Sequence, residues 1–171
     1  MSVIYTWGST AAERADAYPC DALLERADVT VFRAVDVEAS ADFAFRWICQ
    51  LRVAPYSYDL IDNLGRRSPQ QLTPDVDRLA IGQRFMTIFR LSGFEPGRSI
   101  TLLHRGRLFG RVAVTYRVAP AGAGRSRLVA KLLARSEHRR LARAFGPLLA
   151  TGDLVMMRRQ LLNLKALAER E

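Results

Sequence analysis

Apolar side chains near the end of the chain recur with the spacing of one helix face. They follow one another at intervals of three and four residues and are Leu154, Met157, Leu161, Leu164 and Ala168. This spacing predicts an α-helix from Pro147 to Glu169, with proline at the first position, where its missing N–H costs no hydrogen bond. Asp153 is a competing start, because aspartate is a good N-cap. A helix of this length, about 34 Å, needs a broad apolar surface to pack on.

From Gly82 onward, apolar and polar residues alternate with a period of two, which is typical of strands with one buried face. Four strands separated by turns are predicted: Arg84–Ser92, Ser99–Arg105, Phe109–Ala119 and Arg127–Ser136. In the third strand the apolar face carries Val114 and Tyr116, and the opposite face carries Arg117. These strands are expected to form the antiparallel sheet on which the long helix packs.

The first half of the chain predicts one more strand and two short helices. Val29–Val37 is rich in β-branched residues, which favours a strand. Ser40 is a good N-cap for a helix over Ala41–Leu51, and Tyr56–Leu64 has room for two helical turns before Gly65. The predicted fold class is α+β, with a curved antiparallel sheet wrapped around a long C-terminal helix and two short helices after the first strand.

Residues 1–27 are predicted to form a partly helical arm that packs on a single domain at 28–171. Thr10 and Glu13 have capping-box spacing, in which the hydroxyl and the carboxylate each accept a backbone N–H at the start of a helix. Asp21 is the predicted cap of a second short helix over 22–26.

The net charge of +9 is concentrated in one segment. Between Arg98 and Arg143 there are eleven arginines and one lysine against a single acid, while the rest of the chain has a net charge of −2. Several of these cations fall on the polar faces of predicted strands and are expected to face solvent: Arg111, Arg117, Arg127, Lys131 and Arg135. An arginine-rich face can attract anionic lipid or acidic ligands. Nucleic acid is not an expected partner, because no DNA-reading helix or aromatic RNA-binding motif accompanies the charge.

Composition excludes several other classes of protein. No apolar run approaches the ~20 residues that span a bilayer, and the first residues lack a secretory signal pattern, so a cytoplasmic location is expected. Cys20 and Cys49 are expected to be free thiols. There is no HExxH, CxxC, P-loop or GxSxG motif and there are only two histidines, so neither a metal nor another cofactor is expected. The sequence does not indicate an oligomeric state.

The order of the predicted elements resembles that of the START-like (SRPBCC) superfamily. The resemblance rests on that order, on FRWICQL at 45–51, on a strand led by Gly82 and on SRLVAKLLA at 126–134. It covers about residues 28–170 and implies the helix-grip fold of birch-pollen-type allergens, lipid-transfer START domains and aromatic polyketide cyclases. Such proteins enclose an apolar cavity between the sheet and the long helix, where lipid-, sterol- or polyketide-like molecules bind.

By position, the resemblance implies a set of cavity-lining residues. Those on strands are Phe89, Ile100, Leu102, His104, Val114 and Tyr116, those on the long helix are Leu154, Met157 and Leu161, and the short helices add Trp47, Tyr56 and Tyr58, with the two tyrosines near the mouth. Methionine beside leucine suits an adaptable pocket wall. Plain core packing is the alternative for aliphatic residues at helical spacing.

Two side chains are candidates for acid–base chemistry. His104 shares the parity of Ile100 and Leu102 and is therefore expected to point inward, unless it is a strand-edge histidine with its hydrogen bonds already satisfied. Tyr116 can orient a ligand carbonyl through its hydroxyl or simply fill the core.

Four polar residues are weaker candidates. Asp59 and Asp62 have the spacing of a carboxylate pair, but a short exposed helix favours their solvation. Asp153 and Gln160 flank the apolar stripe and are candidates to enter the cavity, with capping and solvent exposure as the alternatives.

Three functions therefore compete. The first is the non-enzymatic binding of a hydrophobic small molecule in the cavity. The second is a cyclase or dehydratase in which Tyr116 and His104 position a carbonyl and move a proton. The third is peripheral binding to an anionic membrane surface through the arginine-rich face.

Overall fold

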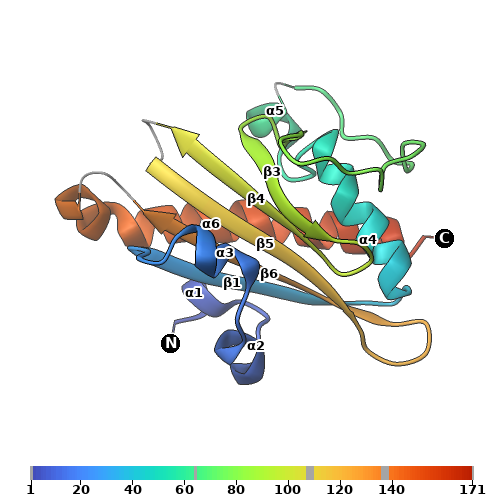
Figure 1. Cartoon of the computed structure of the whole chain (residues 1–171), viewed down its shortest axis with the longest axis horizontal. Helices are drawn as coiled ribbons and strands as arrows, with labels where there is room; N and C mark the ends of the chain where they lie inside the picture. Colours follow the sequence, from blue (N-terminus) through green and yellow to red (C-terminus); the bar gives the residue numbers. More distant parts are fainter. Residues whose placement is uncertain (1, 64, 107–109, 136–138, 171) are drawn as a thin grey trace.

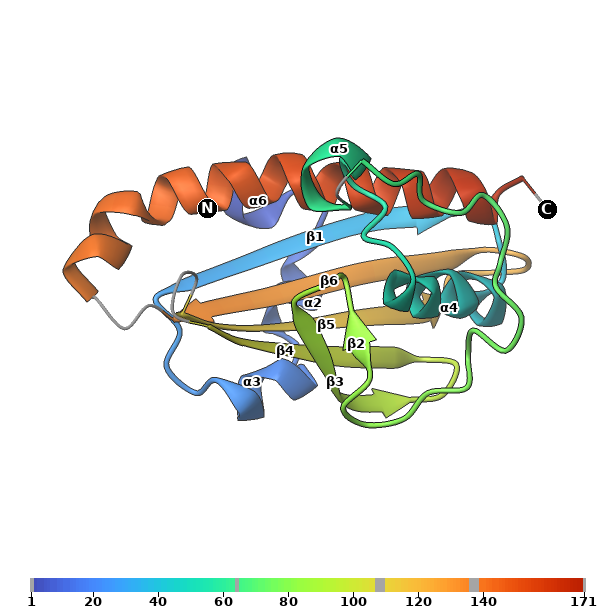
Figure 2. The same cartoon turned by 90° about the horizontal axis from the view of Figure 1, so that it is seen from above.

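The chain folds into one six-stranded antiparallel sheet with helices on both faces (Figures 1 and 2). The computed structural model describes residues 2–63, 65–106, 110–135 and 139–170, with the backbone alone for residues 61, 62 and 139–149. The strands are β1 (Val29–Val37), β2 (Arg84–Phe85), β3 (Phe89–Glu95), β4 (Ser99–Gly106), β5 (Gly110–Pro120) and β6 (Ser126–Arg135). The helices are α1 (Val3–Thr6), α2 (Ala11–Ala15), α3 (Pro19–Leu23), α4 (Ala41–Cys49) followed by the 3₁₀ turn η1 (Gln50–Arg52), α5 (Asp59–Asp62) and α6 (Arg139–Ala168).

The predicted fold class is confirmed. The sheet has the order β1-β6-β5-β4-β3-β2, two short helices follow β1, and a single long helix ends the described chain. The strand predicted over Val29–Val37 has those bounds, and the helix predicted from Ala41 begins there with Ser40 as its cap. The predicted end points Leu64, Phe109 and Ser136 lie outside the described residues.

The strand predicted over Arg84–Ser92 is in fact two strands. Met86 and Thr87 have φ values of 42° and 65°, so the backbone reverses and Phe85 pairs with Phe89. Two consecutive left-handed residues make a tight hairpin turn, which glycine or asparagine usually provides. Neither residue here is of that kind, so the sequence carries no turn signal at this point.

The long helix begins earlier than predicted. It starts at Arg139, so Pro147 lies inside it and does not open it. A proline inside a helix removes one backbone hydrogen bond and favours a bend without always ending the helix, and Figure 2 shows α6 curving near its start. Asp153 lies within the helix and is not a cap.

The N-terminal arm forms three short helices. The capping box of α2 is confirmed, because Thr10 N–H donates to the Glu13 carboxylate at 2.7 Å and Glu13 N–H donates to Thr10 Oγ1 at 3.2 Å. The helix predicted over 22–26 begins at Pro19, so Asp21 is its third residue and accepts the Tyr18 N–H at 2.8 Å. Proline at the first helical position explains the earlier start.

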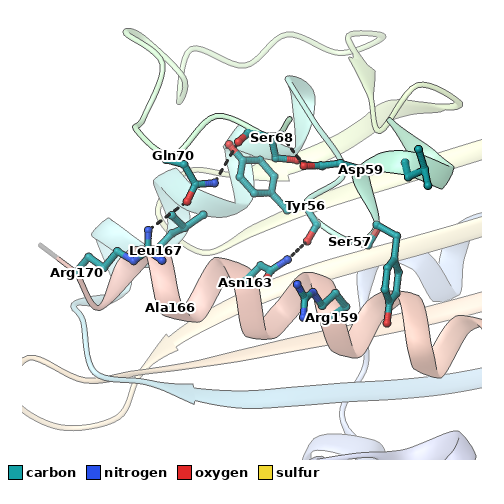
Figure 3. A pocket seen from close by; sticks show the side chains of 12 residues that line it. Tyr56, Ser57, Asp59, Ser68, Gln70, Arg159, Asn163, Ala166, Leu167 and Arg170 are labelled. Carbon is teal, nitrogen blue, oxygen red and sulfur yellow. Dashed lines mark hydrogen bonds between the residues drawn. The ribbon is translucent and has the colours of Figure 1, made fainter. Parts of the chain in front are cut away.

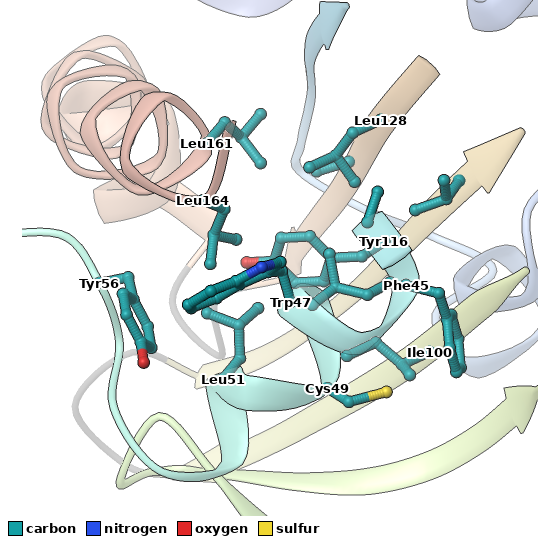
Figure 4. Packing of buried hydrophobic residues seen from close by; sticks show 14 of the residues in the cluster. Phe45, Trp47, Cys49, Leu51, Tyr56, Ile100, Tyr116, Leu128, Leu161 and Leu164 are labelled. Carbon is teal, nitrogen blue, oxygen red and sulfur yellow. The ribbon is translucent and has the colours of Figure 1, made fainter. Parts of the chain in front are cut away.

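One face of the sheet packs on α4 and α6. The core between them contains residues from the sheet and from both helices, and Figure 4 shows the part around Trp47. From α6 it includes Met157, Leu161, Leu164, Leu167 and Ala168. The predicted apolar stripe is therefore correct from Met157 onward, whereas Leu154 is only half-buried.

The arm covers part of the opposite face. Tyr18, Cys20 and Leu24 pack there on a second apolar cluster of the sheet, whose members are Phe32, Ala34, Ala113, Val129 and Leu133. Figure 1 shows α3 in front of the strands and α6 behind them. Cys20 and Cys49 are both buried free thiols.

This arrangement corrects the expectation that the arginines of β5 and β6 face solvent. Arm carboxylates pair with three of these cations: Arg117 with Asp16 at 2.6 Å, Arg127 with Glu13 at 2.7 Å and Lys131 with Asp21 at 2.6 Å. Arg111 donates to the backbone oxygen of Leu23 at 3.2 Å, while Arg135 stays exposed. The alternation was correct, but the polar face lies under an acidic arm, so less basic surface is available to an anionic membrane than the sequence suggests.

Gly8 packs directly against the backbone of β1, and we expect Gly8→Ala to destabilise the folded protein by about 1–3 kcal/mol. Its φ is +75°, and an added Cβ would lie 2.0 Å from the Ala34 carbonyl oxygen. Gly124→Ala is the matched control, because Gly124 has φ +67° with no atom within 4 Å of the added Cβ. Urea unfolding of both variants measures the difference. Equal losses would mean that the contact with Ala34 contributes nothing.

Candidate functional site

A cavity of about 210 Å³ lies between the sheet and α6. We call it the sheet–helix cavity. Its apolar lining consists of Pro55, Met86, Ile88, Phe89, Val114, Leu132, Met156 and Met157, and its polar lining consists of Ser57, Tyr116, Asp153 and Gln160. The β2–β3 turn, β5, β6, α6 and the segment after η1 all contribute, so the cavity exists only in the folded chain.

The sheet register aligns the residues at the floor of this region. Arg33, Ala130, Tyr116 and Ile100 are direct neighbours across β1, β6, β5 and β4. Directly paired residues lie on the same face. The small side chain of Ala130 therefore separates an arginine from a tyrosine on the face toward α6.

Gln160 links α6 to Tyr116. The Tyr116 hydroxyl donates to Gln160 Oε1 at 2.6 Å, and Gln160 Nε2 donates to the Pro55 backbone oxygen at 2.6 Å. Burial, together with the nearby Asp153 carboxylate, raises the pKa of Tyr116 far above the ordinary phenol value. The side chain is consequently a neutral phenol at physiological pH and a hydrogen-bond donor.

Arg33 and Asp153 form an ion pair beside the cavity. Arg33 is fully buried and donates to the Asp153 carboxylate at 2.8 Å, to the Ala150 oxygen at 3.3 Å and to the Phe32 oxygen at 2.8 Å. Burial raises the pKa of Asp153 to about 6, although the nearby Arg33 guanidinium lowers it. A carboxyl group that titrates near neutrality can accept or release a proton under physiological conditions.

A larger pocket of about 520 Å³, the outer pocket, lies between α6 and residues 56–70 (Figure 3). Its polar groups are largely paired with one another. Tyr56 donates to the Pro69 oxygen at 2.7 Å, and Asn163 donates to the Tyr56 oxygen at 2.8 Å. Arg170 donates to Gln70 at 3.1 Å. We take the smaller cavity as the candidate site, because its lining is mostly apolar with a few convergent polar groups.

The predicted lining residues divide among several places. Four of them line the sheet–helix cavity: Phe89, Val114, Tyr116 and Met157. Four others are buried in the core and are not part of its lining: Trp47, Ile100, Leu102 and Leu161. Tyr56 and Tyr58 line the outer pocket. Leu154 is half-buried, because the helix turns Asp153 toward Arg33 one position earlier.

His104 does not line the cavity, contrary to the prediction from its parity. Its ring lies 5.8 Å from that of Phe89, and its Nδ1 is 3.0 Å from the Ile88 backbone oxygen. It lies near the end of β4 and contacts two residues of the cavity lining, Phe89 and Ile88, without lining the cavity itself. This geometry matches the alternative of a satisfied strand-edge histidine.

Asp59, one member of the predicted carboxylate pair, contacts the loop that follows α5. It accepts hydrogen bonds from the Ser68 N–H at 2.9 Å and the Ser68 hydroxyl at 2.5 Å. The Asp62 side chain lies outside what is described. These contacts tie α5 to the following loop.

Sequence reasoning missed Arg33, Pro55 and Met86. A signal did exist for Arg33, because it has the parity of Val31 and Val35 and so lies on an otherwise apolar strand face. The sequence predicted a continuous strand across Met86, so it did not indicate that Met86 lies in a turn. Pro55 takes part through its backbone oxygen alone, which carries no sequence signal.

The described residues contain no group of three or more histidine, cysteine, aspartate or glutamate side chains arranged to hold a metal ion. None of the helices described has both the length and the apolar character needed to cross a membrane.

Comparisons with known proteins find similarity to solved structures and none to sequences. No protein-family model matches the chain, and no curated protein sequence matches it. Among solved structures, the hypothetical protein jhp0584 from Helicobacter pylori is similar with a TM-score of 0.56 and 13% identity, over 94% of this chain and 99% of that one. A protein from Chromobacterium violaceum is similar with a TM-score of 0.54 and 16% identity, over 83% and 98% of the two chains. The ZhuI aromatase/cyclase from Streptomyces sp. R1128 is similar with a TM-score of 0.51 and 18% identity, over 82% and 93%.

These similarities support the START-like helix-grip fold that the element order predicts. At identities of 13 to 18% they show the fold and nothing more specific.

Proposed function

We propose, starting from the helix-grip fold, that the protein binds a small hydrophobic molecule in the sheet–helix cavity. The observation that carries this proposal is the lining, which is apolar on most sides and has a few convergent polar groups. Three flexible methionines, Met86, Met156 and Met157, make the wall adaptable.

The volume limits the size of the ligand. A cavity of roughly 150 Å³ lined by apolar residues is known to hold benzene. At about 210 Å³, the sheet–helix cavity suits a molecule of one or two rings. A whole sterol or a long acyl chain would require it to widen.

We expect 2-naphthol to bind, and Val114→Phe to weaken that binding about tenfold or more, because the added ring fills a space that now holds no protein atoms. Ala166→Phe is the control, since Ala166 is exposed and lines only the outer pocket. Chemical-shift titration of the Met157 methyl group, which lines the cavity and is kept in both variants, gives both affinity and location. Binding that is lost in Ala166→Phe and kept in Val114→Phe would place the ligand in the outer pocket and contradict the proposal.

A cyclase- or dehydratase-type enzyme is the second candidate, and Asp153 favours it. This carboxyl lines the cavity that Tyr116 also lines, and burial raises its pKa to about 6, which suits a general base. The likeness in fold to an aromatase/cyclase agrees with such a role. Exchange of the methyl protons of acetophenone in D₂O, followed by NMR, tests it. Exchange that is equally fast with the wild type and Asp153→Asn would reject Asp153 as the base.

A further inference from the structure

The hydrogen bonds of Gln160 leave one donor without a strong partner. The side chain lies on α6 in the cavity wall and is only 4% exposed. Its Nε2 donates to the Pro55 backbone oxygen, and its Oε1 accepts from the Tyr116 hydroxyl. A backbone carbonyl can only accept a hydrogen bond, so the amide nitrogen must face Pro55 and the orientation of the amide is fixed.

The amide nitrogen carries two hydrogens, and Pro55 takes one of them. The other is directed to Met86 Sδ, which lies 3.1 Å from Nε2. A thioether sulfur is a weak acceptor, and a buried amide N–H gains less from it than from an oxygen. Tyr116 also approaches this sulfur, at 3.9 Å, but its single hydrogen is used at 2.6 Å by Gln160.

Met86 is well placed to give up this position. It lies on the β2–β3 turn, where its own φ and that of Thr87 are positive. Its side chain is half-buried and lines the cavity together with Gln160. An unbranched thioether has several rotatable bonds and repacks easily. Its sulfur can therefore leave Gln160 without disturbing the rest of the core.

We propose that Gln160 recognises a carbonyl oxygen of the bound molecule and that Met86 Sδ occupies the place of this oxygen when the cavity is empty. The inference rests on the proposed function and narrows the ligand to a neutral carbonyl compound of one or two rings. A carboxylate is disfavoured at this position, because Asp153 lines the same cavity and like charges repel.

Acetophenone and α-methylstyrene test the inference, because they differ only in that C=O is replaced by C=CH₂. The affinity of each is measured by NMR titration with the wild type and with Gln160→Leu. We expect the ratio of ketone to hydrocarbon affinity to fall about tenfold in Gln160→Leu, as a hydrogen bond to a buried donor is lost. Comparing ratios between proteins cancels the different solubilities of the two probes in water. A role of Gln160 in packing alone would change both affinities by the same factor.

Met86→Leu is the second variant and keeps the test decisive if Gln160→Leu fails to fold. Removing the sulfur takes away the competing acceptor, so we expect the ketone-to-hydrocarbon ratio to rise relative to the wild type. A ratio that is unchanged in the variants would overturn the carbonyl inference while leaving cavity binding intact. If neither probe nor 2-naphthol binds the wild type, the proposed function fails together with the inference.

Discussion

Arg33→Met is expected to lower the free energy of unfolding by about 3–5 kcal/mol, because it leaves the Asp153 carboxylate in a largely buried site without its partner. Arg33 is fully buried and reaches α6 from β1 through two hydrogen bonds, one to Asp153 at 2.8 Å and one to the Ala150 oxygen at 3.3 Å. The same substitution also removes the donor to the Ala150 oxygen in α6. Chemical denaturation with urea measures the loss.

The double variant Arg33→Met/Asp153→Leu is the control, and it should recover most of the lost stability, since both charges are gone and the volume is kept. The deficit of Arg33→Met should also shrink as the pH falls from 7 to 5. The pKa of Asp153 in the folded protein is already raised to about 6, and removing Arg33 raises it further. The folded state then binds a proton more readily than the unfolded state, so stability is gained at lower pH. A double variant no more stable than Arg33→Met would contradict this account.

Trp47→Ala is expected to cost about 3–5 kcal/mol, the usual range for truncating a large buried aromatic side chain. Trp47 is 1% exposed and meets Tyr56 edge-on at 6.2 Å between ring centroids. Figure 4 shows it between α4 and the α6 residues Leu161 and Leu164. Removing the indole would leave a void between these two helices, which the long helix cannot close without moving along the sheet.

Trp47→Phe separates volume from hydrogen bonding. Among the described residues the buried indole Nε1 has no hydrogen-bond partner, so phenylalanine loses packing and no hydrogen bond. We expect a loss of about 1–2 kcal/mol, within the usual range for point substitutions. Trp7→Ala is the second comparison, since Trp7 is only half-buried. Thermal unfolding in which Trp47→Ala is no worse than Trp7→Ala would contradict the central place of Trp47 in the core.

The parts of the fold that could be predicted are those where apolar and polar positions contrast clearly. The β-branched composition of β1 and the three-and-four spacing of α6 from Met157 onward required only local sequence. Which face of such an element is buried follows from the hydrophobicity of its individual residues. The element order then limited the arrangement enough to suggest the helix-grip fold.

The parts that could not be predicted depend on contacts between distant residues. The reversal at Met86 and Thr87 has no glycine or asparagine to mark it, and it brings Met86 to the cavity. The pairing of Arg33 with Asp153 spans 120 positions, and the local sequence around Asp153 indicated only a helix cap or a cavity residue. His104 shows that parity gives the side of a strand but not the distance along it to a cavity.

The acidic arm illustrates a different difficulty. Its packing was expected, but the strands were assumed to bury a single face, as antiparallel sheets commonly do. Val129 and Leu133 share a face with Lys131 and are buried under Tyr18, Cys20 and Leu24. A sheet face that carries both charged and apolar side chains can face solvent or be covered by another segment with complementary charges. The local sequence does not distinguish these two cases, and the position of the arm shows that the second applies here.

The pairing of β1 with β6 determines when the sheet can be completed during synthesis. Val29 lies opposite Ala134 and Val37 opposite Ser126, so β1 cannot pair with β6 until β6 has left the ribosome. The arm cannot pack in its final position before then either, because its carboxylates pair with cations of β5 and β6. Contacts this distant in sequence are slow to form, and the two apolar faces of β1 stay uncovered until they do. A nascent chain that stops before Ser126 therefore exposes an unpaired hydrophobic strand, and its exposure lasts until β6 is synthesised.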